Sequence, residues 1–281
     1  MQLAKQKQRR ERTRPARGRV RPRLWLALVV LASLSASCGP GSEDPAGGAS
    51  SEASSPATGD GVAETIMENS NEAGAAPSGD PELDARLIGA AGDGDTEAVE
   101  RLLNEGADVD ARDESGRTAL VAAAYGNHLG AAEALIRAEA DVNARDGTEQ
   151  SAYLIATSEV GDDPRLLELT LENGADVRSL DSYDGTGLIR AADRGHVRIV
   201  RRLLETDTDV DHVNELGWTA LLEAVILGGG DARHTEVVRL LVEEGGADPS
   251  IPDGEGVTPL GHARANGYDG MVRILEEAGG R

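Results

Sequence analysis

The 281-residue chain contains no phenylalanine, and aromatic residues make up only 2% of it. A large single core normally buries many aromatic rings, because each ring removes a large apolar area from water. Burial in this chain must therefore come from many small contacts between Ala, Leu and Val side chains. This shortage favours a thin, repetitive architecture over one large core.

Lysine and cysteine are nearly missing as well. The chain has one cysteine, Cys38, and no lysine follows Lys7. Residues 39–281 therefore lack thiol nucleophiles, cysteine-ligated zinc, Schiff-base lysines and lysine-dependent phosphate loops. The Gly-x-Ser-x-Gly motif of serine hydrolases is also missing. We predict that the protein is not an enzyme and that it has no catalytic residues.

The remaining candidates for metal binding are histidines and acidic loops. The five histidines include no His-x-x-x-His pair. The acidic segments that start at Asp108 and Asp141 have Arg112 and Arg145 at the fifth position, where a calcium loop needs an oxygen ligand. His128 and His196 are expected to serve packing and hydrogen bonding. We predict no metal site and no cofactor.

The first 37 residues have the pattern of an export signal. Ten Lys and Arg residues lie between 5 and 23, and an apolar run of 11 residues covers 24–34. A membrane-spanning helix needs about 20 apolar residues, so a signal peptide fits this run better. Cys38 follows in Leu34-Ser-Ala-Ser-Cys38, which resembles a bacterial lipobox, although Ser35 stands where leucine is commonest.

The lipobox resemblance implies that Cys38 is lipidated and begins the mature chain. The alternative is a secreted protein with a chance cysteine near its cleavage site, and the lack of a disulfide partner favours lipidation. Residues 38–80 then form a disordered tether rich in Gly, Ser, Ala, Pro and Glu. We expect the folded part, 81–281, to lie outside the cytoplasm, lipid-anchored on the periplasmic or cell-surface side of a bacterial membrane.

The net charge of the chain limits the kinds of partner that it can bind. Removal of residues 1–37 takes away ten of the 28 basic and one of the 50 acidic residues, so the net charge changes from −22 to −31. Such a surface repels nucleic acid and anionic headgroups, and we expect membrane contact only through the lipid anchor. The acidity itself has two interpretations: a solvated, soluble surface, or a site for a basic partner.

Two groups of residues recur with the same spacing from about residue 82. One is the Gly-Ala-Asp group and its variants, whose middle residues at 107, 140, 175, 208 and 247 are 33, 35, 33 and 39 residues apart. The other is Thr118-Ala-Leu and its equivalents at Ser151, Thr186, Thr219 and Thr258. Two independent groups in step indicate about six structural repeats.

This unit of about 33 residues resembles the ankyrin repeat. Groups such as Ala191-Ala-Asp-Arg-Gly-His196 and Asp141-Val-Asn-Ala144 are similar to those of the family. The resemblance implies an all-α repeat solenoid of about six helix-turn-helix units with β-hairpin fingers and terminal repeats that act as caps. The Thr and Ser residues would cap the first helices, with Pro259 at a first helical position.

Two repeats are irregular. Repeat three has Glu149 where a hairpin glycine is expected, and a two-residue insertion between Glu159 and Asp163. Repeat five has about five extra residues between its helices, in Gly228-Gly-Gly-Asp-Ala-Arg-His234.

The family resemblance implies a protein-protein interaction scaffold that binds partners with its finger tips and first helices. Repeat five stands out at these positions, because four of its five variable residues are apolar. Trp218 is either a binding residue or a core residue that packs on the neighbouring finger. The predicted partner-binding residues are Tyr125, Tyr183, Glu215, Leu216, Trp218, Ile226 and Leu227.

The partner is expected to be a protein, with other envelope proteins as candidates, and the chain itself is expected to be monomeric. The alternative function is binding of a small molecule or envelope polymer through the repeat-five loop, for which a closed pocket beside Trp218 would be needed.

Overall fold

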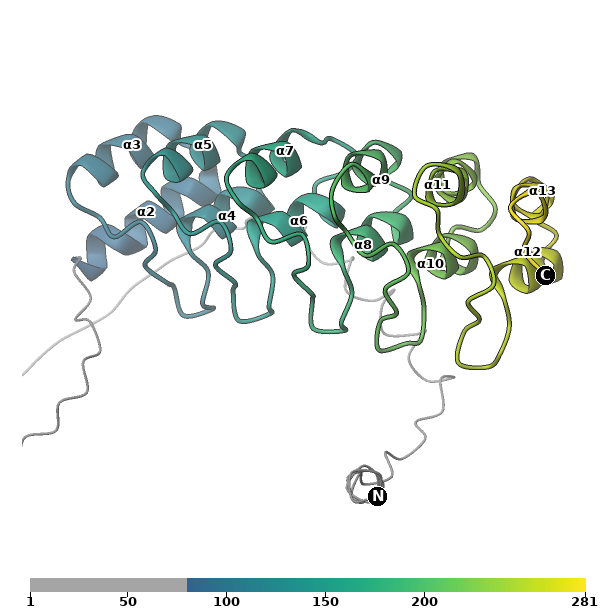
Figure 1. Ribbon diagram of the computed structural model, residues 1–281. Coiled ribbons are helices and arrows are strands. Elements are labelled where there is room, and N and C mark those ends of the chain that lie inside the picture. The colour runs from purple at the N-terminus through teal and green to yellow at the C-terminus, as the bar shows by residue number, and fades with distance from the viewer. Residues whose placement is uncertain (1–79) are drawn as a thin grey trace, which may run out of the picture. The chain divides into compact units, whose positions relative to one another are not determined.

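A computed structural model describes residues 80–281, and in this range the chain forms twelve α-helices in six pairs (Figure 1). The first and second helices of the pairs form two rows, and the long loops between pairs, here called fingers, project from one side of the stack. The pairs are α2 (Pro81–Asp93) and α3 (Thr96–Asn104), α4 (Ala119–Tyr125) and α5 (Leu129–Arg137), α6 (Ala152–Ser158) and α7 (Arg165–Glu172), α8 (Gly187–Asp193) and α9 (Val197–Leu204), α10 (Ala220–Leu227) and α11 (Ala232–Glu243), and α12 (Pro259–Asn266) and α13 (Asp269–Glu277).

This arrangement confirms the predicted helical solenoid of six repeats. The predicted signal peptide, the lipidated Cys38 and the tether up to residue 79 lie outside the described residues and stay predictions. None of the helices within 80–281 is both long and apolar enough to cross a bilayer.

The first helix of each repeat from two to six begins at a hydroxyl cap. The side-chain oxygens of Thr118, Ser151, Thr186, Thr219 and Thr258 accept the backbone N–H of the third following residue at 3.2–3.3 Å. Pro259 occupies the first turn of α12, as predicted. In α2 the cap is Asp80, which accepts the N–H of Glu82 at 3.0 Å. These bonds satisfy donors that a helix start leaves free.

The core is a row of aliphatic and alanine side chains, which agrees with the shortage of aromatic residues. Leu120, Leu188, Leu221 and Leu260 are at most 1% exposed. Tyr153 takes the same position in repeat three, and its hydroxyl donates to the carbonyl of Val177 at 3.3 Å. The next repeat has Gly187 where its neighbours have alanine, because a Cβ there would lie 2.5 Å from the Tyr153 hydroxyl oxygen.

The fingers are held by side-chain caps and hardly at all by strand pairing. Within 80–281 the isolated bridge between Leu180 and Thr186 is the one strand-like pair. In each finger one Asp or Asn side-chain oxygen accepts the backbone N–H groups two and four residues later, which closes the turn. These closing residues are Asp113, Asp146, Asp181, Asn214 and Asp253.

The insertion in repeat five keeps its glycines in the turn between the helices, and its residues from Ala232 onward lengthen the second helix. Helix α11 has 12 residues, against nine in α5 and eight in α9. His234 lies inside α11, whereas His128 and His196 are the residues directly before α5 and α9. The added turn is capped by Asp231, which accepts the N–H of His234 at 2.8 Å.

The insertion in repeat three supplies a cap for the next repeat. Oδ1 of Asp162 accepts the backbone N–H groups of Arg198 and Ile199 at 2.8 and 3.1 Å, at the start of α9. Helix α9 has no side-chain cap of its own, because the ring of His196 donates to the carbonyl of Thr157 instead. The extra residues therefore join two repeats.

Candidate partner-binding surface

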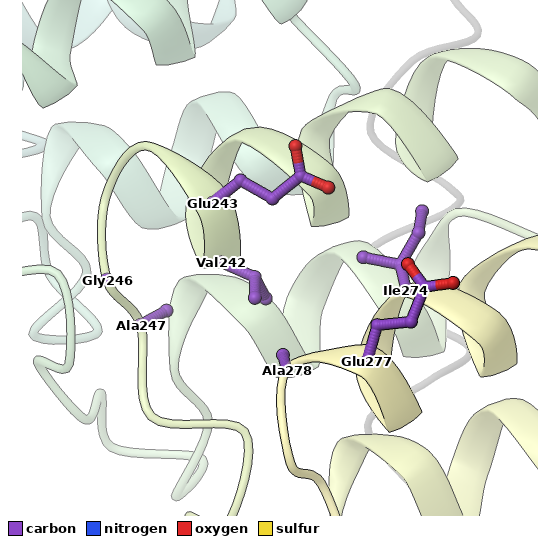
Figure 2. Close-up of a pocket in the computed structure, with 7 residues that line it drawn as sticks. All are labelled: Val242, Glu243, Gly246, Ala247, Ile274, Glu277 and Ala278. Carbon is purple, nitrogen blue, oxygen red and sulfur yellow. The ribbon is translucent and has the colours of Figure 1, made fainter.

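Two of the hollows on the surface of the described residues lie near the ends of the stack, one at each end. The larger, about 810 Å3, lies between α2 and repeat two, over a floor that includes Gly89, Gly92 and Ala122. The smaller, about 410 Å3, lies between the ends of α11 and α13, where Val242, Ala247, Ile274 and Ala278 line it beside the carboxylates of Glu243 and Glu277 (Figure 2). Trp218 lines neither hollow.

The larger hollow shows which positions of a repeat face inward, toward the fingers. From repeat two these include Arg112 and Arg117 in the finger, Ala122 and Tyr125 in α4, and Gly126 directly after α4. In this chain the same five positions of repeat five, each 101 residues later, hold Val213, Trp218, Glu223, Ile226 and Leu227. Four of these five positions are thus apolar in repeat five, whereas the lining residues Ala111 and Asp113 correspond to the polar His212 and Asn214.

The fingers of repeats four and five are joined at their tips. The backbone N–H of Glu215 donates to the carbonyl of Tyr183 at 3.0 Å, and the ring of His212 donates to the carbonyl of Asp184 at 2.7 Å. Tyr183 and Leu216, which are 52% and 54% exposed, therefore belong to neighbouring turns.

The apolar residues at these finger tips and inward positions are here called the repeat-five patch: Tyr183, Val213, Leu216, Trp218, Ile226 and Leu227. Val213 and Leu227 are 46% and 43% exposed, whereas Trp218 and Ile226 are partly buried. Exposed Glu215 lies next to Leu216 in the same turn. Exposed apolar side chains gathered within a charged surround are typical of binding surfaces.

Tyr125 lies apart from this patch, in the larger hollow. It is 42% exposed, and its hydroxyl donates to Oδ2 of Asp146 at 3.0 Å. Burial raises the pKa of Tyr125, and the neighbouring Asp146 carboxylate raises it further. The predicted binding residues therefore fall in two places.

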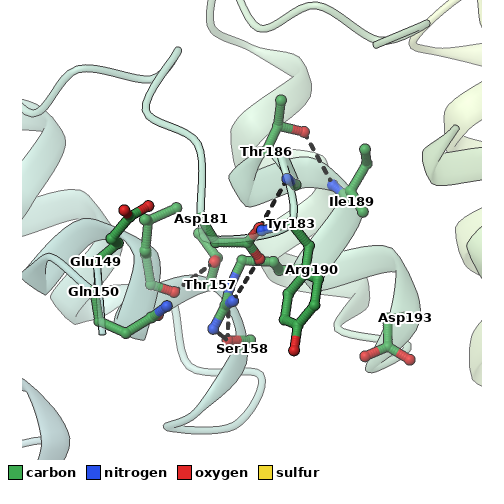
Figure 3. A network of polar contacts seen from close by, with 12 residues as sticks. Glu149, Gln150, Thr157, Ser158, Asp181, Tyr183, Thr186, Ile189, Arg190 and Asp193 are labelled. Carbon is green, nitrogen blue, oxygen red and sulfur yellow. Dashed lines mark hydrogen bonds and ion pairs between the residues drawn. The ribbon is translucent and has the colours of Figure 1, made fainter. Parts of the chain in front are cut away.

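A largely buried ion pair holds α8, the first helix of repeat four, in place. Figure 3 shows the Arg190 guanidinium between Asp181 of the finger and Ser158 at the end of α6. Arg190 donates to Oδ2 of Asp181 and to Oγ of Ser158, at 2.8 and 2.7 Å. Three elements are joined by one side chain, so the finger and the two helices cannot shift independently.

Repeat five replaces this ion pair with a carboxyl group and an amide. Glu223 occupies the position of Arg190, Asn214 that of Asp181, and Nδ2 of Asn214 donates to Oε1 of Glu223 at 2.9 Å. Glu223 is 5% exposed. Burial raises its pKa to about 7, with a further contribution from the negative charge of Asp193.

Comparison with known proteins now identifies the architecture. The sequence matches the family described as ankyrin repeats, three copies, over residues 80–146 and 153–253. The chain belongs to the ankyrin repeat family. An ankyrin repeat domain from Acinetobacter baumannii AYE superposes with a TM-score of 0.65 at 45% identity, over 69% of this chain and 98% of that one.

Other ankyrin relatives agree on the fold. The ankyrin repeat protein YahD of Escherichia coli K12 is 38% identical over 121 residues, which is 43% of this chain and 60% of YahD. A chain from the complex of a Bdellovibrio bacteriovorus predatory endopeptidase with an immunity protein has a TM-score of 0.60, over 68% of this chain and 97% of that chain. At 24% identity this last similarity concerns the fold alone.

Within the ankyrin array, the sequence prediction missed Glu223, Asn214, Val213 and the larger hollow. A signal for the first two was present, because a polar residue follows the turn-closing residue by nine positions in repeats four, five and six. These pairs are Asp181 with Arg190, Asn214 with Glu223, and Asp253 with His262, whose ring nitrogen lies 2.7 Å from Oδ2 of Asp253. Among residues 80–281, no cluster of three His, Cys, Asp or Glu side chains is arranged to hold a metal ion.

Proposed function

We propose that this protein is a non-catalytic scaffold that binds a protein partner through the repeat-five patch. The observation behind the proposal is the concentration of apolar side chains at inward positions of one repeat. The positions of Trp218, Ile226 and Leu227 hold Gly185, Asp193 and Arg194 in repeat four, and Arg117, Tyr125 and Gly126 in repeat two. Leu216 and Leu227 leave about half of their apolar side chains in water, and such exposure favours a binding role.

We further propose that the scaffold is extracytoplasmic and held at a bacterial membrane by a lipid on Cys38. This part rests on the sequence, where a basic segment, an 11-residue apolar run and a lone cysteine follow one another. The partner is then expected to be another envelope protein. The strongly acidic chain would itself contact the membrane only through its lipid.

Site-specific photocrosslinking in the native host tests the binding proposal. A photoreactive residue in place of Leu216 is expected to give a discrete adduct with one protein. The matched control places the same residue at Glu133, which is exposed on α5 in the row of second helices. Equal adducts from both positions, or an adduct from Glu133 alone, would contradict the proposed surface.

The role of Trp218 is tested by Trp218→Ala in the same system. If Trp218 contacts the partner, the variant keeps its thermal unfolding temperature and loses the adduct formed at Leu216. A cooperative loss of stability would place the ring in the core.

Anchoring is tested separately with Cys38→Ser. The wild-type chain is expected to incorporate a radiolabelled fatty acid and to sediment with membranes. The variant is expected to lose the label and to leave the membrane fraction. Equal labelling of both chains would rule out Cys38 as the lipid attachment site.

A further inference from the structure

Repeat five lacks a donor side chain that its neighbours have beside the turn-closing residue. In repeats four and six, the carboxylate of the turn-closing aspartate meets a donor side chain, Arg190 or His262, at 2.8 and 2.7 Å. In repeat five an amide has replaced the aspartate and Glu223 has replaced the donor. The repeat therefore keeps one carboxyl group and has no cation beside it.

No other part of the described chain supplies that cation. Oε1 of Glu223 accepts one hydrogen bond, from Asn214, and no bond from residues 80–281 reaches Oε2. The charged groups that act most strongly on Glu223 are Asp193 and Asp181, which have the same sign. Two arginines of repeat four pair with other carboxylates, Arg190 with Asp181 and Arg194 with Asp193 and Glu159.

Glu223 also occupies an inward position in the same repeat as most of the repeat-five patch. Its equivalent in repeat two, Ala122, lines the floor of the larger hollow, so this position faces inward. Ile226 and Leu227 follow it on the same helix, and Trp218 precedes that helix. A carboxylate among apolar side chains matches a lysine or arginine, which has an aliphatic stem and a charged end.

We propose that the partner inserts a lysine or arginine side chain into the repeat-five patch, where Glu223 pairs with its charge. The stem of that side chain packs on Ile226 and Leu227, and neighbouring apolar residues of the partner cover Tyr183 and Leu216. Charge complementarity supports this partner, because residues 80–281 hold 18 basic and 42 acidic residues. An acidic segment would be repelled from the same surface. This inference rests on the proposed function and specifies its partner.

A phage-displayed library of random peptides tests the inference on the full-length protein. Peptides are selected at about pH 8, where Glu223, with a pKa of about 7, is largely ionised. The selected peptides are expected to share a lysine or arginine next to apolar residues. Their binding should be lost with the double variant Leu216→Ser/Leu227→Ser, which changes two exposed side chains.

The decisive variant is Glu223→Gln, which keeps the shape and an oxygen that can accept from Asn214. It is expected to weaken the selected peptides about tenfold or more, because a buried charge pair is lost. Glu215→Gln, at an exposed carboxylate of the same patch, is the matched control and should change affinity less than about threefold. Unfolding curves of both variants report whether the fold is intact.

The outcomes separate this inference from the proposed function. If the selected peptides need the two leucines but lack a basic residue, or bind Glu223→Gln as well as wild type, the inference is overturned and the proposed surface stands. If no peptide that depends on the two leucines is selected, both are overturned.

Discussion

The buried carboxyl group of Glu223 makes the stability of this ankyrin array depend on pH in an unusual direction. Burial, assisted by Asp193, raises the pKa of Glu223 from an ordinary value of 4.5 to about 7. The folded state thus holds a proton that the unfolded chain releases at lower pH. The stability that this proton provides is fully present below about pH 4.5 and is lost as the pH rises through about 7.

The size of this change in unfolding free energy follows from the pKa shift of Glu223. A change from 4.5 to about 7, at about 1.36 kcal/mol for each pH unit, corresponds to about 3 kcal/mol. The side chain is only 5% exposed, so solvent screening does little to reduce this value. Wild type is therefore expected to lose about 3 kcal/mol of unfolding free energy between about pH 4.5 and about pH 8, relative to a variant that cannot ionise there.

Glu223→Gln is that variant, and urea unfolding at a series of pH values is the assay. The stability difference between Glu223→Gln and wild type should grow in favour of the variant as the pH rises through about 7, the folded pKa of Glu223. Other groups are common to both proteins and cancel in the difference. Parallel pH profiles for the two proteins would refute the reasoning, as would a variant that gains relative stability toward acid.

The aspartates that close the finger turns act in the opposite direction and in another pH range. Burial raises the pKa of Asp146 and Asp253, but hydrogen bonds from backbone N–H groups and side chains outweigh it and leave both below 3.8. Their contribution is present above the unfolded value of 3.8 and is lost as the pH falls through the lower folded pKa. The window from about pH 5 to 8 therefore separates the titration of Glu223 from that of these aspartates.

Two further predictions concern the backbone. Glu139 is exposed and has a φ of 68°, whereas the equivalent residues of other repeats include the glycines Gly106 and Gly174. Because glycine adopts a positive φ without strain, Glu139→Gly should stabilise the array by about 1 kcal/mol in urea unfolding. Glu139→Ala removes the same charge without relieving the backbone, and an equal gain from it would contradict this explanation. Asp162→Ala removes the acceptor at the start of α9 and should cost about 1 kcal/mol, measured in the same way. Protection of the Ile199 amide from hydrogen exchange should fall with it, and unchanged protection would show that Asp162 does not cap α9.

The sequence by itself determined the repeat architecture. Thr118 and its equivalents begin helices because a hydroxyl at that position can accept a free backbone N–H, and this requirement is local to four residues. The recurrence of such groups about every 33 residues then places every helix pair, because each repeat packs mainly on its neighbours. In a solenoid, sequence signals within each repeat are enough to specify the whole fold, which explains why the predicted repeats are confirmed.

The tertiary structure decided what depends on contacts between repeats. Asp162 becomes a helix cap only when repeat four is packed beside it, and Gly187 is needed only because Tyr153 of the preceding repeat fills the space. In the insertion of repeat five the glycines form a turn, whereas the residues after Asp231 add a turn to α11, which Asp231 caps. In the same way, Glu223 is an ordinary helix residue in the sequence. Its burial beside Asn214, and with it the unpaired carboxyl group of the repeat-five patch, arises only when finger and helix pack together.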